Sequence, residues 1–269
     1  MSVAAASRPI GVFDSGVGGL TVVRALMERL PLENIVYFGD TARVPYGVKS
    51  VATIEHFTAQ ITEFLLKRDV KMLIIACNTM AAVAAEVVHR LAAGIPVLDV
   101  IEAGARAAVA ASPGRRIGVI GTPTTINSNA YARRMHELDP TVRVYSQACP
   151  LFVPLVEEGW LEHEVTRLTA QEYLRPVLAE EVDSLVLGCT HYPLLKPLLR
   201  DVAGPRVRLI DSALTTAEFA AERLQQAGLA RGGGAADYRF VVSDVPLRFQ
   251  TIGERFLGRS LGAVEKVDW

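Results

Sequence analysis

Two cysteines stand in the same local context, one in each half of the chain. Cys77 follows the apolar run of segment 71–76, Cys189 follows that of segment 183–188, and each precedes small residues that form hydrogen bonds. A short apolar run between polar residues is typical of a strand buried on both faces of a parallel sheet. Because ligands collect at the carboxyl ends of such strands, the sequence predicts two thiols, each at the ligand-binding edge of a sheet.

Two such thiols could invert a stereocentre. A thiol beside a helix N-terminus can be tuned to ionise, because the positive end of the helix and the backbone amides favour the thiolate. One thiolate could take a proton from one face of a carbon acid while the other thiol returns a proton to the opposite face. A single buried cysteine is more often a small hydrophobic residue, but two in matching contexts favour a catalytic pair. Cys149 precedes Pro150, which has no backbone amide, and is predicted to be structural.

Polar residues at other predicted strand ends could assist the thiols. Asp14 follows the apolar run 10–13 and could orient or deprotonate the first thiol. His191 could do the same for the second thiol, with help from Glu157 or Glu158. Short hydrogen-bonding side chains at strand ends are suited to binding the carboxylates and the ammonium of an amino acid; they are Ser15, Asn78, Thr79, Thr122 and Thr190.

Composition excludes several classes of protein. The 269 residues are 50% hydrophobic and 21% charged, enough for one large or two ordinary α/β domains with full cores. A net charge of -1 gives no global basic field that would attract nucleic acid or an anionic membrane. No stretch reaches the roughly 18 unbroken apolar residues that a membrane span needs. Three cysteines without a Cys-x-x-Cys pair are typical of reduced thiols in a cytoplasm.

Apolar runs alternate with helical periodicities along almost the whole chain. Predicted strands cover 10–13, 34–39, 71–76, 96–100, 116–122, 142–145, 183–188, 207–210, 238–243 and 263–267. Predicted helices cover 20–30, 50–69, 80–93, 101–111, 125–138, 164–181, 194–202, 215–227 and 245–257. Residues 1–7 are predicted to form a short frayed tail that is no signal peptide, and 149–160, with two prolines, a constrained loop. The glycine-rich turn 14–19 matches neither the dinucleotide fingerprint nor the P-loop.

The pattern repeats within the chain. Segment 10–16 aligns with 117–123 at an offset of 107, and Cys77 aligns with Cys189 at an offset of 112. We therefore expect an α/β fold with two pseudo-symmetric domains, whose mainly parallel sheets are flanked by helices and whose active site lies in the cleft between them. The C-terminal elements have no counterpart in the repeat and are expected to complete the first domain. The predicted domains are residues 1–100 with 213–269, and residues 101–212.

Four motifs resemble the glutamate racemase family of the aspartate/glutamate racemase superfamily. They are Val12–Leu20, Tyr37–Thr41 with Pro45–Gly47, Ala76–Thr79 and Leu187–Leu194. The resemblance runs from about residue 10 to the C-terminus, and the last motif is the most specific. It implies a racemase that needs neither cofactor nor metal and that converts L-glutamate to D-glutamate in the bacterial cytoplasm. The product would supply peptidoglycan synthesis, and with it cell-wall biogenesis and cell shape.

The resemblance also assigns roles to single residues. It implies Cys77 and Cys189 as the catalytic pair, assisted by Asp14 and His191. A further carboxylate falls in the pair 157–158, where Glu157 is preferred. The implied substrate contacts are Asp14, Ser15, Tyr46, Gly47, Asn78, Thr79, Thr122, Thr125, Thr190 and His191. Glutamate is the implied small-molecule partner, and a homodimer is the assembly expected.

Three other functions stay open on the sequence. Racemases of aspartate or hydantoins share the two-cysteine layout, and only the context of residues 190–193 argues against them. A thiol redox or peroxidase protein would also need an ionised cysteine, but no resolving cysteine lies near either thiol in the sequence. A metal-binding module using Cys77, Cys189 and His191 is disfavoured, because two separated thiols and one imidazole make a poor zinc site.

Overall fold

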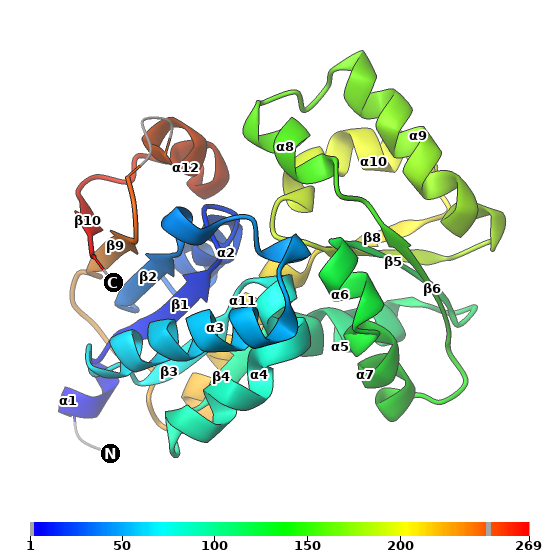
Figure 1. Cartoon of the computed structure of the whole chain (residues 1–269). Coiled ribbons are helices and arrows are strands. Elements are labelled where there is room, and N and C mark those ends of the chain that lie inside the picture. Colours follow the sequence, from blue (N-terminus) through cyan, green and yellow to red (C-terminus); the bar gives the residue numbers. More distant parts are fainter. Residues whose placement is uncertain (1–2, 246–248, 269) are drawn as a thin grey trace.

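A computed structural model describes residues 3–245 and 249–268 and contains two sheets flanked by helices, one in each lobe of the molecule (Figure 1). The first sheet has the strand order β10-β9-β2-β1-β3-β4 and the second the order β6-β5-β7-β8. The described strands are β1 Ile10–Asp14, β2 Ile35–Gly39, β3 Met72–Ile75, β4 Val97–Asp99, β5 Arg116–Gly121, β6 Arg143–Ala148, β7 Ser184–Gly188, β8 Arg208–Ile210, β9 Tyr238–Val242 and β10 Val264–Lys266. The α/β fold class predicted from the sequence is confirmed.

Helices follow most strands and cover the sheets. They are α1 Val3–Ala6, α2 Leu20–Arg29, α3 Val51–Leu66, α4 Asn78–Ala92, α5 Val100–Ala111, α6 Pro123–Asn127, α7 Ala130–Leu138, α8 Phe152–Glu157, α9 Glu164–Ala179, α10 Lys196–Ala203, α11 Ser212–Gln226 and α12 Phe249–Leu257, with short 3-10 turns at Thr41–Arg43, Tyr46–Val48 and Tyr192–Leu195. Across the described ranges, none of these helices is long and apolar enough to cross a membrane.

The strand order shows the duplication directly. The sequence β2-β1-β3-β4 in the first sheet corresponds to β6-β5-β7-β8 in the second, and every neighbouring pair within these two sets is parallel. Every residue of β1, β3 and β7 is buried, as expected for central strands covered on both faces. Cys77 and Cys189 follow β3 and β7, which hold equivalent places in the two sheets.

The C-terminal part of the chain returns to the first sheet. Strand β9 pairs in parallel with β2, and β10 pairs in parallel with β9. The predicted helix 245–257 includes residues 246–248, which lie outside the described residues, and its remainder forms α12. We propose on this pairing that the domains are residues 1–100 with 213–269 and residues 101–212.

Three predictions about local structure are wrong. Segment 149–160 is not a loop throughout, because it contains α8; Pro154 lies in the first turn, where backbone amides have no intrahelical partner, so its missing N–H costs no hydrogen bond. The helix predicted at 125–138 is broken at Asn129, whose φ of 55° is left-handed. The tail predicted at residues 1–7 contains the short helix α1.

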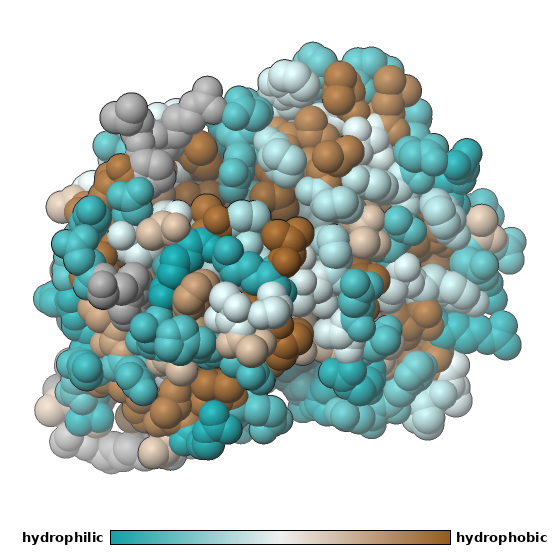
Figure 2. Space-filling model, in the orientation of Figure 1, coloured by the Kyte–Doolittle hydropathy of each residue, from teal (hydrophilic) through white to brown (hydrophobic). Residues whose placement is uncertain are grey.

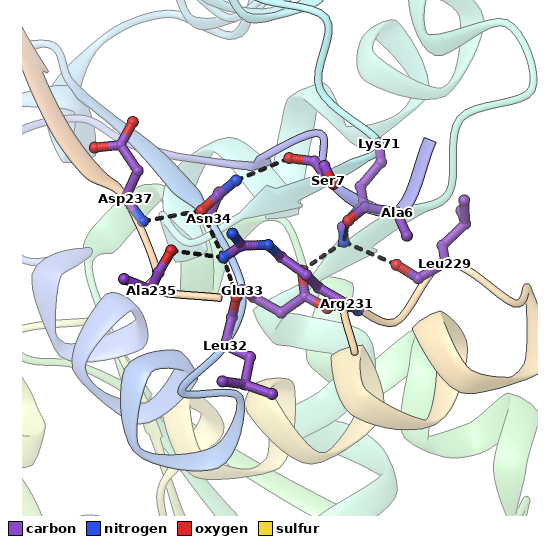
Figure 3. A network of polar contacts seen from close by, with 10 residues as sticks. All are labelled: Ala6, Ser7, Leu32, Glu33, Asn34, Lys71, Leu229, Arg231, Ala235 and Asp237. Carbon is purple, nitrogen blue, oxygen red and sulfur yellow. Dashed lines mark hydrogen bonds and ion pairs between the residues drawn. The ribbon is translucent and has the colours of Figure 1, made fainter. Parts of the chain in front are cut away.

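A buried polar network holds the tail and the returning chain against the first sheet (Figure 3). The side chains of Lys71 and Glu33 are 1% and 3% exposed and form an ion pair of 2.5 Å. Lys71 Nζ also donates to the carbonyl oxygens of Ala6 and Leu229, and the backbone amide of Arg231 donates to Glu33. The network therefore joins α1, the segments that enter β2 and β3, and the linker between α11 and β9.

We expect Lys71→Met to lower the free energy of unfolding by about 3–5 kcal/mol, because Glu33 would remain buried without its cation. Denaturant unfolding followed by circular dichroism measures the change. Arg175→Met is the control, since it removes the exposed ion pair with Glu172 and should cost only about 0.3–0.5 kcal/mol. Equal losses for the two variants would show that the buried pair does not anchor the fold.

Candidate active site

A cavity of about 460 Å³ lies between the carboxyl ends of the two sheets. Its walls come from the segments that follow β1, β2 and β3 on one side and β5, β6 and β7 on the other. Exposed apolar side chains, among them Val44 and Val48, border it, and Figure 2 shows apolar side chains where the two lobes meet. The predicted site residues that line it are Cys77, Cys189, Ser15, Tyr46, Gly47, Asn78, Thr79, Thr122, Glu157, Thr190 and His191.

Cys77 is a protonated thiol in this environment. Its Sγ donates to Ser15 Oγ at 3.5 Å, and the side chain is buried at the N-cap of α4. Burial and the nearby charge of Asp14 raise the pKa of Cys77 to about 12, although hydrogen bonds from Ser15 and the Met80 amide oppose this. In the substrate-free protein this thiol is therefore ready to give a proton.

Asp14 lies behind the cavity wall at the end of β1. Its Oδ2 accepts from the backbone amide of Gly16 at 3.0 Å, while its buried Oδ1 has no partner among the described residues. Burial raises the pKa of Asp14 above its usual value, and the charge of His191 and three backbone amides moderate that rise. Asp14 can therefore hold a proton or accept a hydrogen bond from a ligand.

Cys189 lies beside an imidazole that is held by a carboxylate. His191 Nδ1 is 3.9 Å from Cys189 Sγ, and His191 Nε2 is 2.9 Å from Glu157 Oε1. Burial lowers the pKa of His191, but the interactions with Cys189 and Glu157 outweigh burial and raise it to about 10. The raised pKa favours the imidazolium, and its Nδ1 faces the sulfur of Cys189. Of the two candidate carboxylates, Glu157 is the one that contacts His191.

The two thiols therefore differ in their surroundings. Cys77 lies near a negative carboxylate and Cys189 near a positive imidazolium. An acid stands on one side of the cavity and a potential base on the other, which suits a proton transfer across a ligand between them.

Hydroxyl and amide side chains complete the wall. Thr79, in the first turn of α4, and Thr122, which follows β5, lie with their hydroxyl oxygens 3.0 Å apart, and Thr125, behind the wall, is 2.9 Å from Thr122. The buried Nδ2 of Asn78 has no partner among the described residues, although Asn78 lines the cavity. Because buried donors are almost always satisfied, this amide points to a ligand that brings an acceptor.

A close approach joins the two halves at the second thiol. Gly18, in the turn after β1, lies so near the segment after β7 that an added Cβ would be 2.1 Å from Thr190 Oγ1 and 2.6 Å from His191 Nδ1. Thr21 Oγ1 also donates to the carbonyl oxygen of Thr190 at 3.2 Å. Gly18 is therefore needed because the two halves pack closely at this turn, and a nucleotide-binding role is not required to explain the glycine.

The chain matches the Asp/Glu/Hydantoin racemase family over residues 19–220. A glutamate racemase of Syntrophus aciditrophicus is 70% identical over 260 residues, or 96% of each chain, and one of Neisseria meningitidis is 64% identical over 261 residues, or 97% of this chain and 96% of that one. The chain belongs to the Asp/Glu/Hydantoin racemase family. A crystal structure of a Francisella tularensis glutamate racemase in complex with D-glutamate is similar at 45% identity and a TM-score of 0.93, covering 98% of each chain.

In this family member, sequence reasoning missed two residues of α12, one that contacts the imidazole and one that contacts the backbone at the end of α8. The ring of Phe256 meets that of His191 edge to face, with centroids 4.9 Å apart. Arg255 Nη1 donates to the carbonyl oxygens of Val156 and Glu157 at 3.2 and 3.3 Å, at the C-terminus of α8, where a cation is favourable. The two residues lie in an ordinary amphipathic helix, so no local signal marked them.

Asp40 was also missed, although it directly follows β2, beside the end of β1 where Asp14 lies. It is fully buried, and its carboxylate accepts from the hydroxyl of Tyr46, from Arg43 Nε at 2.6 Å and from Ser243 Oγ at 2.7 Å. Tyr46 lines the cavity. The rule that polar residues gather at strand ends would have found Asp40 as a support for that tyrosine.

We expect Glu157→Gln to lower the pKa of His191 from about 10, because the variant loses the carboxylate charge that favours the imidazolium. NMR titration of the imidazole protons measures this pKa. Glu158→Gln is the control and should leave the pKa of His191 unchanged. Because the pKa of His191 is about 10 in the folded protein and 6.5 in the unfolded chain, the charged imidazole stabilises the fold. This contribution is complete below pH 6.5 and is lost as the pH rises through about 10. The stability difference between the two variants should shrink over that range. An unchanged His191 pKa in Glu157→Gln would contradict this geometry.

Proposed function

We propose that this racemase family member interconverts L- and D-glutamate through Cys77 and Cys189, without a cofactor. The single observation that carries the proposal is that two thiols follow equivalent strands of two duplicated sheets and line one cavity. Glutamate as substrate is supported by relatives named glutamate racemase at 70% and 64% identity, and by a similar structure in complex with D-glutamate.

The reaction begins with binding of the amino acid between the thiols. Donors on the cavity wall hold the carboxylates: the free amide of Asn78 and the hydroxyls of Ser15, Thr79, Thr122 and Thr190, with Thr125 supporting Thr122. The free Oδ1 of Asp14 is suited to the substrate's ammonium. Tyr46 and Gly47 close the side formed by the segment after β2.

Proton transfer then inverts the Cα. A thiolate of one cysteine takes the Cα proton, negative charge develops at the carbon and its carboxylate, and the thiol of the other cysteine gives its proton to the opposite face. The reverse reaction exchanges these roles. Asp14 can accept or return a proton on the side of Cys77, and His191, held by Glu157, can do so on the side of Cys189.

The biological setting follows from the product. D-glutamate made in this way would serve peptidoglycan synthesis, in the cytoplasm where its precursors are assembled. A homodimer is the assembly that we propose, and light scattering of the purified protein tests it.

Polarimetry or circular dichroism of purified protein with L-glutamate, D-glutamate, L-aspartate and D-aspartate tests the substrate. We expect both glutamate enantiomers to reach a racemic mixture without added cofactor, and aspartate to react at least about 100-fold more slowly. Faster conversion of aspartate than of glutamate would show that the protein is an aspartate racemase. Failure to convert either amino acid, together with thiol-dependent peroxide turnover, would favour the redox alternative.

A further inference from the structure

Tyr131 in α7 lies between the two segments that carry the thiols. Its side chain is 2% exposed, and its hydroxyl donates to Asn78 Oδ1 at 2.7 Å; Asn78 directly follows Cys77. Its ring lies against the end of β7, since a Cβ built on Gly188 would be 3.1 Å from Tyr131 Cε2, and Gly188 directly precedes Cys189. One side chain from the second half thus contacts both thiol-bearing segments.

The hydrogen bond favours one orientation of the Asn78 amide. The two ends of an asparagine amide have nearly the same shape and differ in hydrogen bonding, one accepting and one donating. Tyr131 occupies Oδ1, so the donor Nδ2, which has no partner among the described residues, is left for a ligand. The carbonyl oxygen of Val100 is another acceptor near the tyrosine hydroxyl, but at 3.5 Å it makes the weaker bond.

We propose that Tyr131 is a positioning residue for substrate binding, which holds the Asn78 amide with Nδ2 directed at a substrate carboxylate. The proposal rests on the proposed function, in which an anionic amino acid occupies the cavity. Tyr131 is not one of the described residues that line the cavity, so it acts through Asn78 and touches no substrate. With the amide reversed, Oδ1 would face the carboxylate and repel it.

The first arm of the test needs no substrate. In NMR spectra of nitrogen-15-labelled protein, Asn78→Ala identifies the side-chain amide signals of Asn78 by their disappearance. Tyr131→Phe should shift these signals, because the hydroxyl no longer bonds to Oδ1. Tyr192→Phe is the matched control: it also removes a buried hydroxyl, which donates to the carbonyl oxygen of Cys149 at 2.8 Å, and should leave the Asn78 signals in place. Unchanged signals in Tyr131→Phe would overturn the proposal.

The second arm measures kinetics with glutamate. Loss of an ordinary hydrogen bond changes an equilibrium by about two- to tenfold, so Tyr131→Phe should raise KM about fivefold and leave kcat within about twofold. In an Asn78→Ala background the same substitution should leave KM unchanged, since its target is gone. An equal rise in both backgrounds, or a fall in kcat alone, would overturn the proposal. If the unmutated protein does not convert glutamate, the proposed function fails, and the NMR arm still decides whether Tyr131 fixes the amide.

Discussion

Replacing either Cys77 or Cys189 by serine is expected to abolish racemisation of glutamate. Inversion needs a base on one face of Cα and an acid on the other, and the cavity supplies one thiol from each half of the protein. Serine keeps the size of the side chain but ionises far less readily than a thiol. A missing general acid or base costs on the order of 10²–10⁴-fold in rate, so activity should fall by at least about 100-fold in both variants.

Half of the chemistry should survive in each variant. A threo-3-chloro analogue of glutamate needs only one deprotonation: the Cα–H bond breaks toward a thiolate, a double bond forms between Cα and Cβ, and chloride leaves. Each variant keeps one thiol, so the two variants should release chloride from opposite enantiomers of the analogue. A preference of both variants for the same enantiomer would contradict placement of the thiols on opposite faces. Circular dichroism of each variant shows whether it is folded.

Asp14→Asn and His191→Asn are expected to impair different halves of the reaction. Asp14 is electrostatically coupled to Cys77, and His191 Nδ1 lies 3.9 Å from Cys189 Sγ. Each variant should therefore slow chloride release from the enantiomer that its neighbouring thiol deprotonates, by about 10²-fold or more, and spare the other. Equal losses for both enantiomers, or losses below about tenfold, would reduce these residues to structural roles.

With glutamate as the substrate, this asymmetry between the two variants can be measured only in part. The equilibrium constant between enantiomers is one, so kcat/KM must fall equally in both directions, and unequal effects appear only in kcat and KM separately. Asp14→Asn has a second effect of opposite sign, because loss of the carboxylate charge lowers the pKa of Cys77. Faster elimination in that variant would show that the charge matters more than proton acceptance.

Much of the fold was predictable because the sheets are parallel and buried. Apolar runs such as 71–76 and 183–188 indicate central strands, and ligands lie at the carboxyl ends of such strands. That rule places Asp14 and Cys77 at the edge of one sheet and Cys189 at the edge of the other. The cleft expected from the repeat brings the two edges together, and the two thiols do line one cavity with Asp14 behind its wall. The internal repeat further indicated two pseudo-symmetric domains, and the strands β2-β1-β3-β4 of the first sheet do correspond to β6-β5-β7-β8 of the second.

The parts that were not predictable depend on helix phase and on distant contacts. The sequence could not choose between Glu157 and Glu158 from spacing, since segment 149–160 was expected to be a loop, and only the turn of α8 directs Glu157 to His191. Arg255 and Phe256 contact residues that lie far from them along the chain, up to 99 positions away. The surface pattern of an amphipathic helix does not indicate such distant partners.

The most direct test of the two-thiol account is conversion of L-glutamate in deuterated water, stopped early and analysed by mass spectrometry for each enantiomer. If one thiol removes the Cα proton and the other delivers a solvent-derived one, the D-glutamate formed carries deuterium at Cα while the remaining L-glutamate keeps its protium. A single base would act on both faces. Deuterium entering the remaining L-glutamate as fast as D-glutamate forms, or protium retained in the D-glutamate, would contradict the account.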